Sequence, residues 1–308
     1  VCGWFLVAAY LTNVPMNSTA IGLIVDGLDG NADILKFGFH YAVAGFEIYF
    51  GEMIFAAAIL VLFGILNILG VKKAGIIQTI LSSLLAASVL TLAVTALFSA
   101  KAKGIHMEPI WGFDKIAAMD ANAAGESIND FAHTGAKGIL SAILATFAIA
   151  PWAYVGFDTI PQAAEEFNFS YKKVIFIMVV AILFGCFVYT TNNTVTAAAL
   201  ENWPERVMAG EWVLLVAAEE MLGVFGKVLI GLAVSCAVLS GIMGFYLASS
   251  RLLYSMAKES FLPRVFEKID DKHGTPKNAI IFCILISLSG PILGREALGW
   301  FVDMSAIG

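Results

Sequence analysis

The chain has 308 residues, of which 59% are hydrophobic and 14% are charged, and its mean hydropathy is +0.85. This composition indicates a polytopic membrane protein and excludes an ordinary soluble domain. The net charge of -6 comes without a basic cluster, so we expect no nucleic-acid partner.

Seven apolar runs are long enough, or nearly long enough, to cross a bilayer, which takes about 20 residues. In chain order they are residues 1–25, 50–69, 76–98, 139–157, 174–200, 228–248 and 278–293. The first residue already lies in an apolar run and another run opens at residue 298, so we expect a piece cut from a longer protein. Residues 201–227 contain a short amphipathic stretch, which we expect to lie at the membrane interface.

Basic residues gather in alternate links, and this asymmetry predicts the orientation. The links after the second, fourth and sixth runs hold ten of the 18 lysines and arginines, although they are much shorter than the other links. By the positive-inside rule these links are cytoplasmic. Residues 26–49, 100–138 and 201–227 then face outward.

The fourth run is interrupted by residues that break helices. Pro151, Gly156 and Pro161 follow one another at intervals of five. Proline removes a backbone donor, and glycine adopts dihedral angles that other residues avoid. In hydrocarbon the freed backbone groups must find partners, so a broken span is expected where it is buried in protein or lines a polar cavity. We therefore expect a binding site at membrane depth here.

Two kinds of polar residue in the runs are site candidates. Asp158 follows the break, and an ionised side chain at the bilayer centre costs about 2.5–3.5 kcal/mol, which favours a function. The alternative, an acid that caps a resumed helix, stays open. Asn13 and Asn17 are four residues apart and flank Pro15, so they either line a cavity or form an interhelical hydrogen-bond pair.

No spacing of reactive residues predicts an enzyme or a metal site. The cysteines stand singly in apolar runs and are expected to be small core residues: Cys2, Cys186, Cys236 and Cys283. The histidines fall in links and are expected to be solvated: His40, His106, His133 and His273. Neither a paired catalytic acid nor a phosphate-binding GxxxxGK[ST] loop accompanies Asp158. We expect no catalytic residue, no metal and no cofactor apart from a coupling ion, either proton or sodium.

Three motifs carry a family resemblance. They are GILNILGVKKAGIIQTIL at residues 64–81, PWAYVGFDTIPQAAEE at residues 151–166, and SSRLLYSMAKESFLPRVFEKIDDKHGTPKNAI at residues 249–280. Together they resemble the amino acid, polyamine and organocation (APC) superfamily of secondary transporters. The third motif is the most specific of the three, because its pattern is not explained by composition.

The resemblance implies an all-α polytopic fold of two five-helix inverted repeats with a broken helix six. Residues 1–308 would then form a single transmembrane transporter domain that is incomplete at both ends and holds helices three to nine with the start of ten. The unwound, substrate-binding segment would be Ala150, Pro151, Trp152, Ala153, Tyr154, Val155, Gly156 and Phe157. Asp158 matches the place of a proton-sensitive acid in certain family antiporters.

Two departures from the family pattern affect these expectations. Many proton-coupled members carry a lysine in helix five, where this chain has Leu85. The usual proline after the acidic pair is absent, because residues 167–173 read FNFSYKK. Proton coupling through the lysine and the shape of the link after helix six are therefore open.

The resemblance implies a secondary active transporter of amino acids or related organic amines that works by alternating access. Its partners would be that substrate and the lipid bilayer, and its location the plasma (inner) membrane. The oligomeric state stays open. An alternative is a non-transporting amino-acid sensor or partner subunit on the same fold, which would bind without flux.

Overall fold

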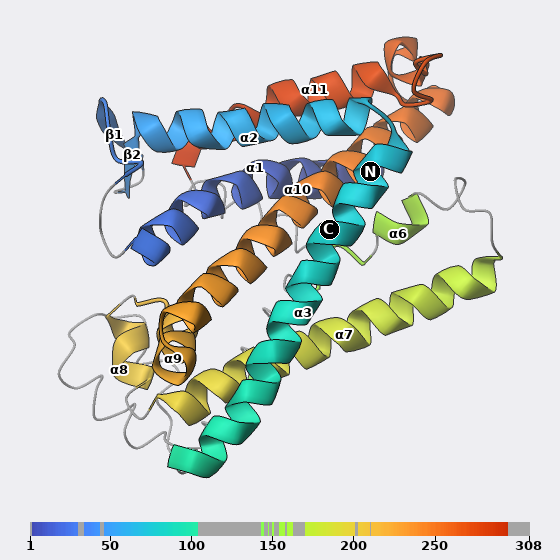
Figure 1. Cartoon of the computed structure of the whole chain (residues 1–308). Helices are drawn as coiled ribbons and strands as arrows, with labels where there is room; N and C mark the ends of the chain where they lie inside the picture. The colour runs from blue at the N-terminus through green and yellow to red at the C-terminus, as the bar shows by residue number, and fades with distance from the viewer. Residues whose placement is uncertain are drawn as a thin grey trace. The chain divides into compact units, whose positions relative to one another are not determined.

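The computed structural model of the chain describes residues 2–29, 34–43, 46–103, 143–144, 147, 150, 154–157, 159–162, 170–200, 203–209 and 211–294. Most of them are helical (Figure 1). The longer helices are α1 (Cys2–Asp29), α2 (Phe50–Ile68), α3 (Val71–Lys103), α7 (Tyr171–Ala199), α10 (Val224–Lys258) and α11 (Lys277–Ser287). The short ones are α6 (Thr159–Gln162), α8 (Trp203–Met208), α9 (Val213–Leu222) and the 3-10 helix η2 (Arg264–Glu267). Strands β1 (His40–Val43) and β2 (Phe46–Tyr49) pair as an antiparallel hairpin.

Five of the described helices are long and apolar enough to cross a membrane: Phe50–Ile68, Lys72–Ala96, Lys172–Ala199, Val224–Lys258 and Lys277–Gly294. They confirm five of the seven predicted runs. Helix α1 forms over the first predicted run, with Pro15 inside it, and is not among those five. The fourth run, residues 139–157, lies mostly outside the described residues. Helix α9 has ten residues, too few to cross a bilayer, as the sequence predicted for its stretch.

The chain divides into two compact units. The first consists of Val1–Ala87, Gly156–Ile182 and Gly231–Gly308, and the second of Ser88–Val155 and Leu183–Ile230. Helices α3, α7 and α10 each contribute residues to both units. The boundary also falls inside the interrupted segment, between Val155 and Gly156.

In the first unit, α2 packs against both α1 and α11 (Figure 1). A Cβ atom at Gly64 of α2 would overlap the side chain of Ile284 on α11, so glycine lets these two helices approach closely. Helix α10 joins the same core, because the buried Tyr246 hydroxyl donates a 3.2 Å hydrogen bond to the carbonyl oxygen of Leu60. These contacts make a scaffold of four helices.

The cysteines only partly follow the sequence prediction. Cys236 and Cys283 are buried, and the Cys283 sulfur lies 3.4 Å from the Ser249 hydroxyl. Cys186 is exposed on α7, so the prediction of a core residue is wrong for it. The sequence does not distinguish buried from exposed cysteines here, because each stands alone in an apolar run and α7 exposes apolar side chains as well.

The N-terminal end of α2 is capped by the chain just before it. The backbone N–H groups of Phe50 and Gly51 donate to the carbonyl oxygens of Phe39 and Phe37, at 3.0 and 3.1 Å. A Cβ at Gly51 would overlap the carbonyl oxygen of Leu35 and the ring of Phe37. The link before α2 therefore satisfies two N–H groups that a helix start leaves without intrahelical partners.

The C-terminal end of α2 is held by a distant part of the chain. The buried Thr275 hydroxyl donates a 3.1 Å hydrogen bond to the carbonyl oxygen of Ile68, 207 residues away in sequence. Gly274, with φ +66°, turns the chain into this contact, and Pro276 precedes the first residue of α11. Gly274 therefore makes the turn, Thr275 bonds to the end of α2, and Pro276 comes just before α11.

The turn before Thr275 is closed by a histidine–aspartate pair. His273 Nδ1 lies 2.6 Å from Asp270 Oδ2, and the His273 N–H donates to the same oxygen at 3.2 Å. The hydrogen bond from His273 lowers the pKa of the Asp270 carboxyl, and the charges of His273 and Lys277 add to this, outweighing partial burial. The prediction of a merely solvated histidine is wrong for His273, because the turn brings a carboxylate three residues away onto its ring.

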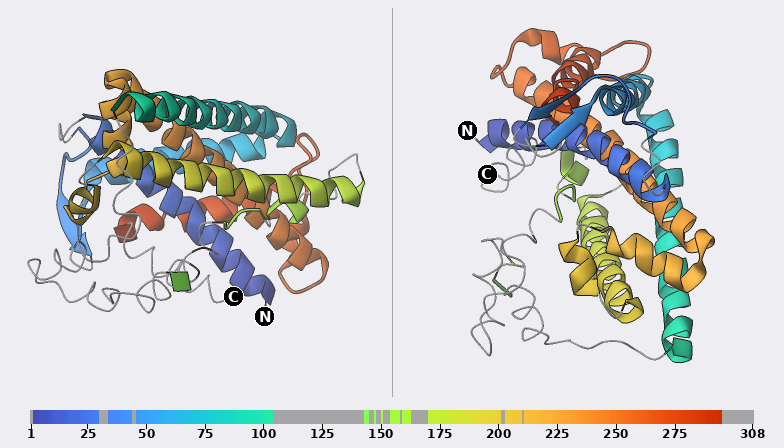
Figure 2. Two further views of the ribbon diagram at one scale, coloured as in Figure 1. Left: turned by 90° about the horizontal axis from the view of Figure 1, so that it is seen from below. Right: turned by 90° about the vertical axis from the view of Figure 1, so that its left-hand side faces the viewer.

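The second unit contains α8 and α9, which lie side by side (Figures 1 and 2). The Arg206 guanidinium on α8 is 3.1 Å from the carboxylate of Glu211 and 3.5 Å from that of Glu220 on α9. A Cβ at Gly226 would overlap the backbone of Ala218, so the start of α10 sits directly against α9. Ion pairs and close packing thus hold this short amphipathic region.

Candidate functional site

The predicted break is present where the structure describes it. Ala150 is helical, Tyr154–Phe157 form a turn, and α6 begins at Thr159. Gly156 has φ +121°, a backbone conformation that residues with a side chain rarely adopt. Pro161 lies in the first turn of α6, where its missing N–H costs nothing. The glycine and the second proline therefore each suit their local geometry.

The carbonyl groups of this segment are partly engaged by the segment itself. Both the N–H and the hydroxyl of Thr159 donate to the Gly156 carbonyl oxygen, at 3.1 and 2.5 Å. The Tyr154 N–H donates to the Ala150 carbonyl oxygen at 3.3 Å. The Gly156 carbonyl is thus already an acceptor, whereas the resemblance implies carbonyls free for substrate.

The described members of the predicted binding segment have aromatic neighbours. In the first unit Gly156 faces the Phe245 ring, which packs against Tyr10 with ring centroids 6.1 Å apart. In the second unit the Tyr154 ring meets Tyr189 edge-on at 5.7 Å. Pro151, Trp152, Ala153 and Asp158, which the sequence also singled out, lie outside the described residues.

Asn13 and Asn17 are joined to their own helix. The buried Asn13 side-chain amide donates to the Ala9 carbonyl oxygen, and that of Asn17 donates to the Asn13 carbonyl oxygen, both at 2.8 Å. The Asn17 side chain also packs against Gly241 of α10. These contacts favour a role in helix packing over the cavity-lining alternative.

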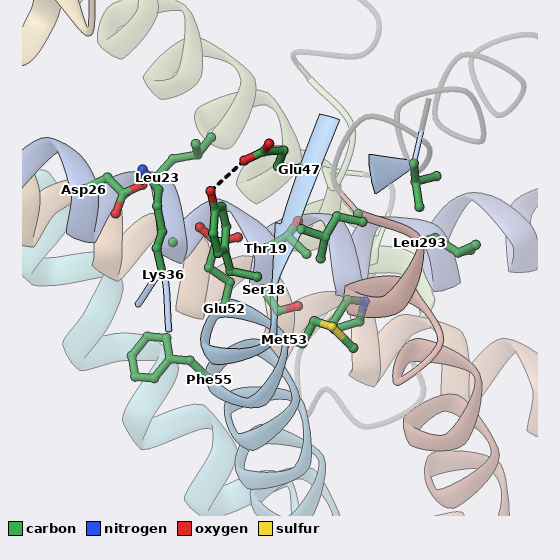
Figure 3. A pocket seen from close by; sticks show the side chains of 16 residues that line it. Ser18, Thr19, Leu23, Asp26, Lys36, Glu47, Glu52, Met53, Phe55 and Leu293 are labelled. Atoms are coloured by element: carbon green, nitrogen blue, oxygen red, sulfur yellow. Dashed lines mark hydrogen bonds and ion pairs between the residues drawn. The ribbon is translucent and has the colours of Figure 1, made fainter. Parts of the chain in front are cut away.

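A cavity of about 300 Å³ lies at the N-terminal end of α2 (Figure 3). It is bounded by the second half of α1, the link before α2, the hairpin, the first turns of α2 and the chain after α11. Its polar lining consists of Ser18, Thr19, Asp26, Lys36, Glu47, Tyr49 and Glu52. The Lys36 ammonium lies 3.5 Å from Asp26, and the Tyr49 hydroxyl donates to Glu47 at 2.6 Å.

Sequence reasoning did not find this cavity. It placed residues 26–49 in an outward link and did not bring them together with the start of the second run. The available signal was the grouping of Asp26, Lys36, Glu47 and Glu52 around one end of one span. Within the described residues, no three histidine, cysteine or acidic side chains are close enough to hold a metal ion.

The helices that can cross a membrane, together with the turn in an apolar segment, define an integral, polytopic α-helical membrane protein. A sequence model of the amino acid permease family matches residues 1–308. The chain therefore belongs to the amino acid permease family, whose members are transporters and not enzymes. The predicted membership of the APC superfamily is confirmed, and its transporter fold is implied for this chain.

Individual relatives match about half of the chain. The large neutral amino acids transporter small subunit 2 of Oryctolagus cuniculus is 29% identical over 146 residues, 47% of this chain and 27% of that protein. The Asc-type amino acid transporter 1 of Homo sapiens is 28% identical over 144 residues, 47% of this chain and 26% of that protein. An uncharacterized protein of Methanocaldococcus jannaschii is 28% identical over 163 residues, 50% of this chain and 37% of that protein. The matched part thus spans little more than a quarter of the two named transporters.

Proposed function

We propose that the protein is a secondary active transporter of amino acids or related organic amines, and that substrate binds at the unwound segment Ala150–Phe157. The observation that carries this proposal is a turn with Gly156 at φ +121° inside an apolar segment of an amino acid permease. Two relatives named as amino acid transporters support the substrate class.

The physical basis is the behaviour of backbone at membrane depth. Where a helix unwinds, N–H and C=O groups lose their intrahelical partners and become available to a polar substrate. The aromatic residues of the turn, Tyr154 and Phe157, supply apolar contact for the rest of that substrate. The driving energy is an ion or exchange gradient, and one charge moving down the membrane potential contributes about 2.3 kcal/mol per 100 mV.

The finer features of the proposal follow from the family. Residues 1–308 belong to one transporter domain and contribute to both of its inverted five-helix repeats, and the protein works in the plasma (inner) membrane. Asp158 is the acid that responds to protons. The uptake experiment below identifies the coupling ion, either proton or sodium.

The test is uptake by the intact protein in proteoliposomes. A panel of labelled amino acids and polyamines is offered under a proton gradient, a sodium gradient or preloaded exchange substrate, and at least one is expected to accumulate. If nothing moves while one of these compounds still raises the melting temperature, the protein is a sensor or partner subunit and the transporter proposal fails.

Two variants test the site. Gly156→Ala forces a side chain into a conformation that costs about 1–3 kcal/mol, so uptake is expected to fall about tenfold or more. Gly75→Ala is the matched control, because a Cβ there meets no atom within 4 Å. Asp158→Asn is expected to change the pH profile of uptake. Full uptake by monodisperse Gly156→Ala protein would mean that the turn at Gly156 is not needed for transport. An unchanged pH profile for Asp158→Asn would mean that Asp158 is not the proton-sensitive acid.

A further inference from the structure

The link before α2 holds large apolar side chains in the open. Ile34, Phe37 and Phe39 are 58%, 54% and 58% exposed, although they belong to no membrane-spanning helix. Leu35 between them is buried, with 8% exposed. Exposed side chains of this size are costly in water, since burying one fully contributes about 1.5–3 kcal/mol. Three of them in six residues form a patch that needs a partner.

Phe37 and Phe39 are held in place by contacts with α2 and the hairpin. The carbonyl oxygens of Phe37 and Phe39 accept hydrogen bonds from the first two residues of α2. The Phe39 ring packs on Phe50 with centroids 4.7 Å apart and stacks with Tyr41 at 6.4 Å. The Phe39 ring therefore packs on protein, while Phe39 remains 58% exposed.

Their height relative to the membrane follows from the helix to which they are attached. Phe50 and Gly51 begin a helix that can cross the bilayer, and one turn of helix rises about 5.4 Å. Phe37 and Phe39 thus lie within about one turn of the hydrocarbon boundary. Ile54 on α2 is also 49% exposed, which suits a lipid-facing position in a spanning helix. Interfacial helices bury Phe and Leu side chains at this depth, in the headgroup–acyl boundary.

Within the described part of the link, the charged side chains of Lys36 and Glu47 line the cavity. The ammonium group of Lys36, between Leu35 and Phe37, pairs with Asp26 and lines the cavity (Figure 3). The patch therefore presents apolar surface without an anionic-lipid requirement.

We propose that Ile34, Phe37 and Phe39, the interface anchor, insert into the headgroup–acyl boundary of the bilayer and set the depth at which α2 begins. The partner is the lipid surface itself, and a zwitterionic phosphatidylcholine bilayer is sufficient. Phe37 and Phe39 also cap α2, and Lys36 beside Phe37 lines the cavity. Insertion of the anchor would therefore fix the position of the link that forms one wall of the cavity. This inference does not depend on the proposed transport function.

The test uses the intact protein in phosphatidylcholine nanodiscs, with its native cysteines replaced and one spin label at residue 37 or 39. Collision rates are measured with oxygen, which partitions into lipid, and with a water-soluble nickel chelate. The lipid reference is Ile54→Cys on the same helix, and the water reference is Asp271→Cys in the exposed turn after η2. At Phe37→Cys and Phe39→Cys the oxygen-to-nickel ratio is expected to be several-fold above that of Asp271→Cys.

A nickel-dominated ratio at both positions would place the anchor in water and overturn the proposal. Low collision rates with both reagents would mean that protein covers the patch, which would overturn it too. Because cysteine removes the Phe39–Phe50 ring contact, Phe39→Trp provides a second measurement that keeps an aromatic ring. Its added fluorescence should be quenched by lipid brominated near the carbonyl region, and quenching by aqueous iodide instead would contradict the inference.

Discussion

The two ends of α2 are held by different means. At the N-terminal end, backbone carbonyl groups of the preceding link accept hydrogen bonds from the first two residues of the helix. At the C-terminal end, the side chain of Thr275 reaches the carbonyl oxygen of Ile68 from 207 residues away. The first arrangement needs only a local segment of the right shape, whereas the second needs the link before α11 to fold against α2.

This difference explains what the sequence motifs record. A local backbone cap leaves little trace in the sequence, because carbonyl groups are common to all residues. Its clearest marks are Gly38, which has φ +86°, and Gly51. A long-range tie needs particular side chains at particular places, so it appears as the specific pattern around Gly274 and Thr275. The most specific motif of the chain therefore includes a structural joint of the scaffold.

The largest effect is expected at the N-terminal end, from Gly51→Ala. A Cβ there would overlap the Leu35 carbonyl oxygen and the Phe37 ring, so the cap must move or break. Overpacking of this kind costs about 1–3 kcal/mol. We expect the melting temperature of the purified protein to fall by several degrees.

The control for that variant is Gly75→Ala in α3. A Cβ at Gly75 meets no atom within 4 Å, so only the helix propensity of alanine acts, which favours the variant by up to about 1 kcal/mol. Equal melting temperatures for the two variants would mean that the link does not pack on α2 in this way.

A smaller loss is expected at the C-terminal end, from Thr275→Val. Valine keeps the volume of the buried threonine but cannot donate to Ile68, and a hydrogen bond of this kind contributes about 1 kcal/mol. Thr79→Val is the matched control, since the exposed Thr79 hydroxyl bonds only within its own helix. The tie is refuted as a source of stability if both variants melt alike.

Much of the helical layout could be predicted from the sequence, because apolar length alone identifies a membrane span. Five predicted runs coincide with helices that can cross a membrane. Helix α9, with ten residues, is too short to do so. The sequence predicts less well which residues of an apolar helix are buried. Cys186 and Cys283 have similar apolar neighbours in the sequence, yet one is exposed and the other is buried.

The candidate site could be predicted only in part. Gly156 and its neighbouring prolines mark a break through their own backbone chemistry, and the described turn has the expected dihedral angle at Gly156. The bond from Thr159 to the Gly156 carbonyl depends on the turn once formed, and no spacing rule foresees it. The cavity around Lys36 was missed because its walls come from five separate segments, which only tertiary packing assembles.

The smallest expected effect concerns the pair that closes the turn before Thr275, tested by Asp270→Asn. The pKa of Asp270 is lower in the folded protein than its usual value of about 4. The ionised carboxylate therefore stabilises the folded state above about pH 4, and this contribution is lost as the pH falls through the folded-state pKa. The melting temperature of the variant should lie slightly below that of the parent near neutral pH, and the two should converge in acid. Asp271→Asn, which changes an exposed neighbour, should show no such convergence, and a constant offset for Asp270→Asn at every pH would mean that the carboxylate charge is not what holds the turn.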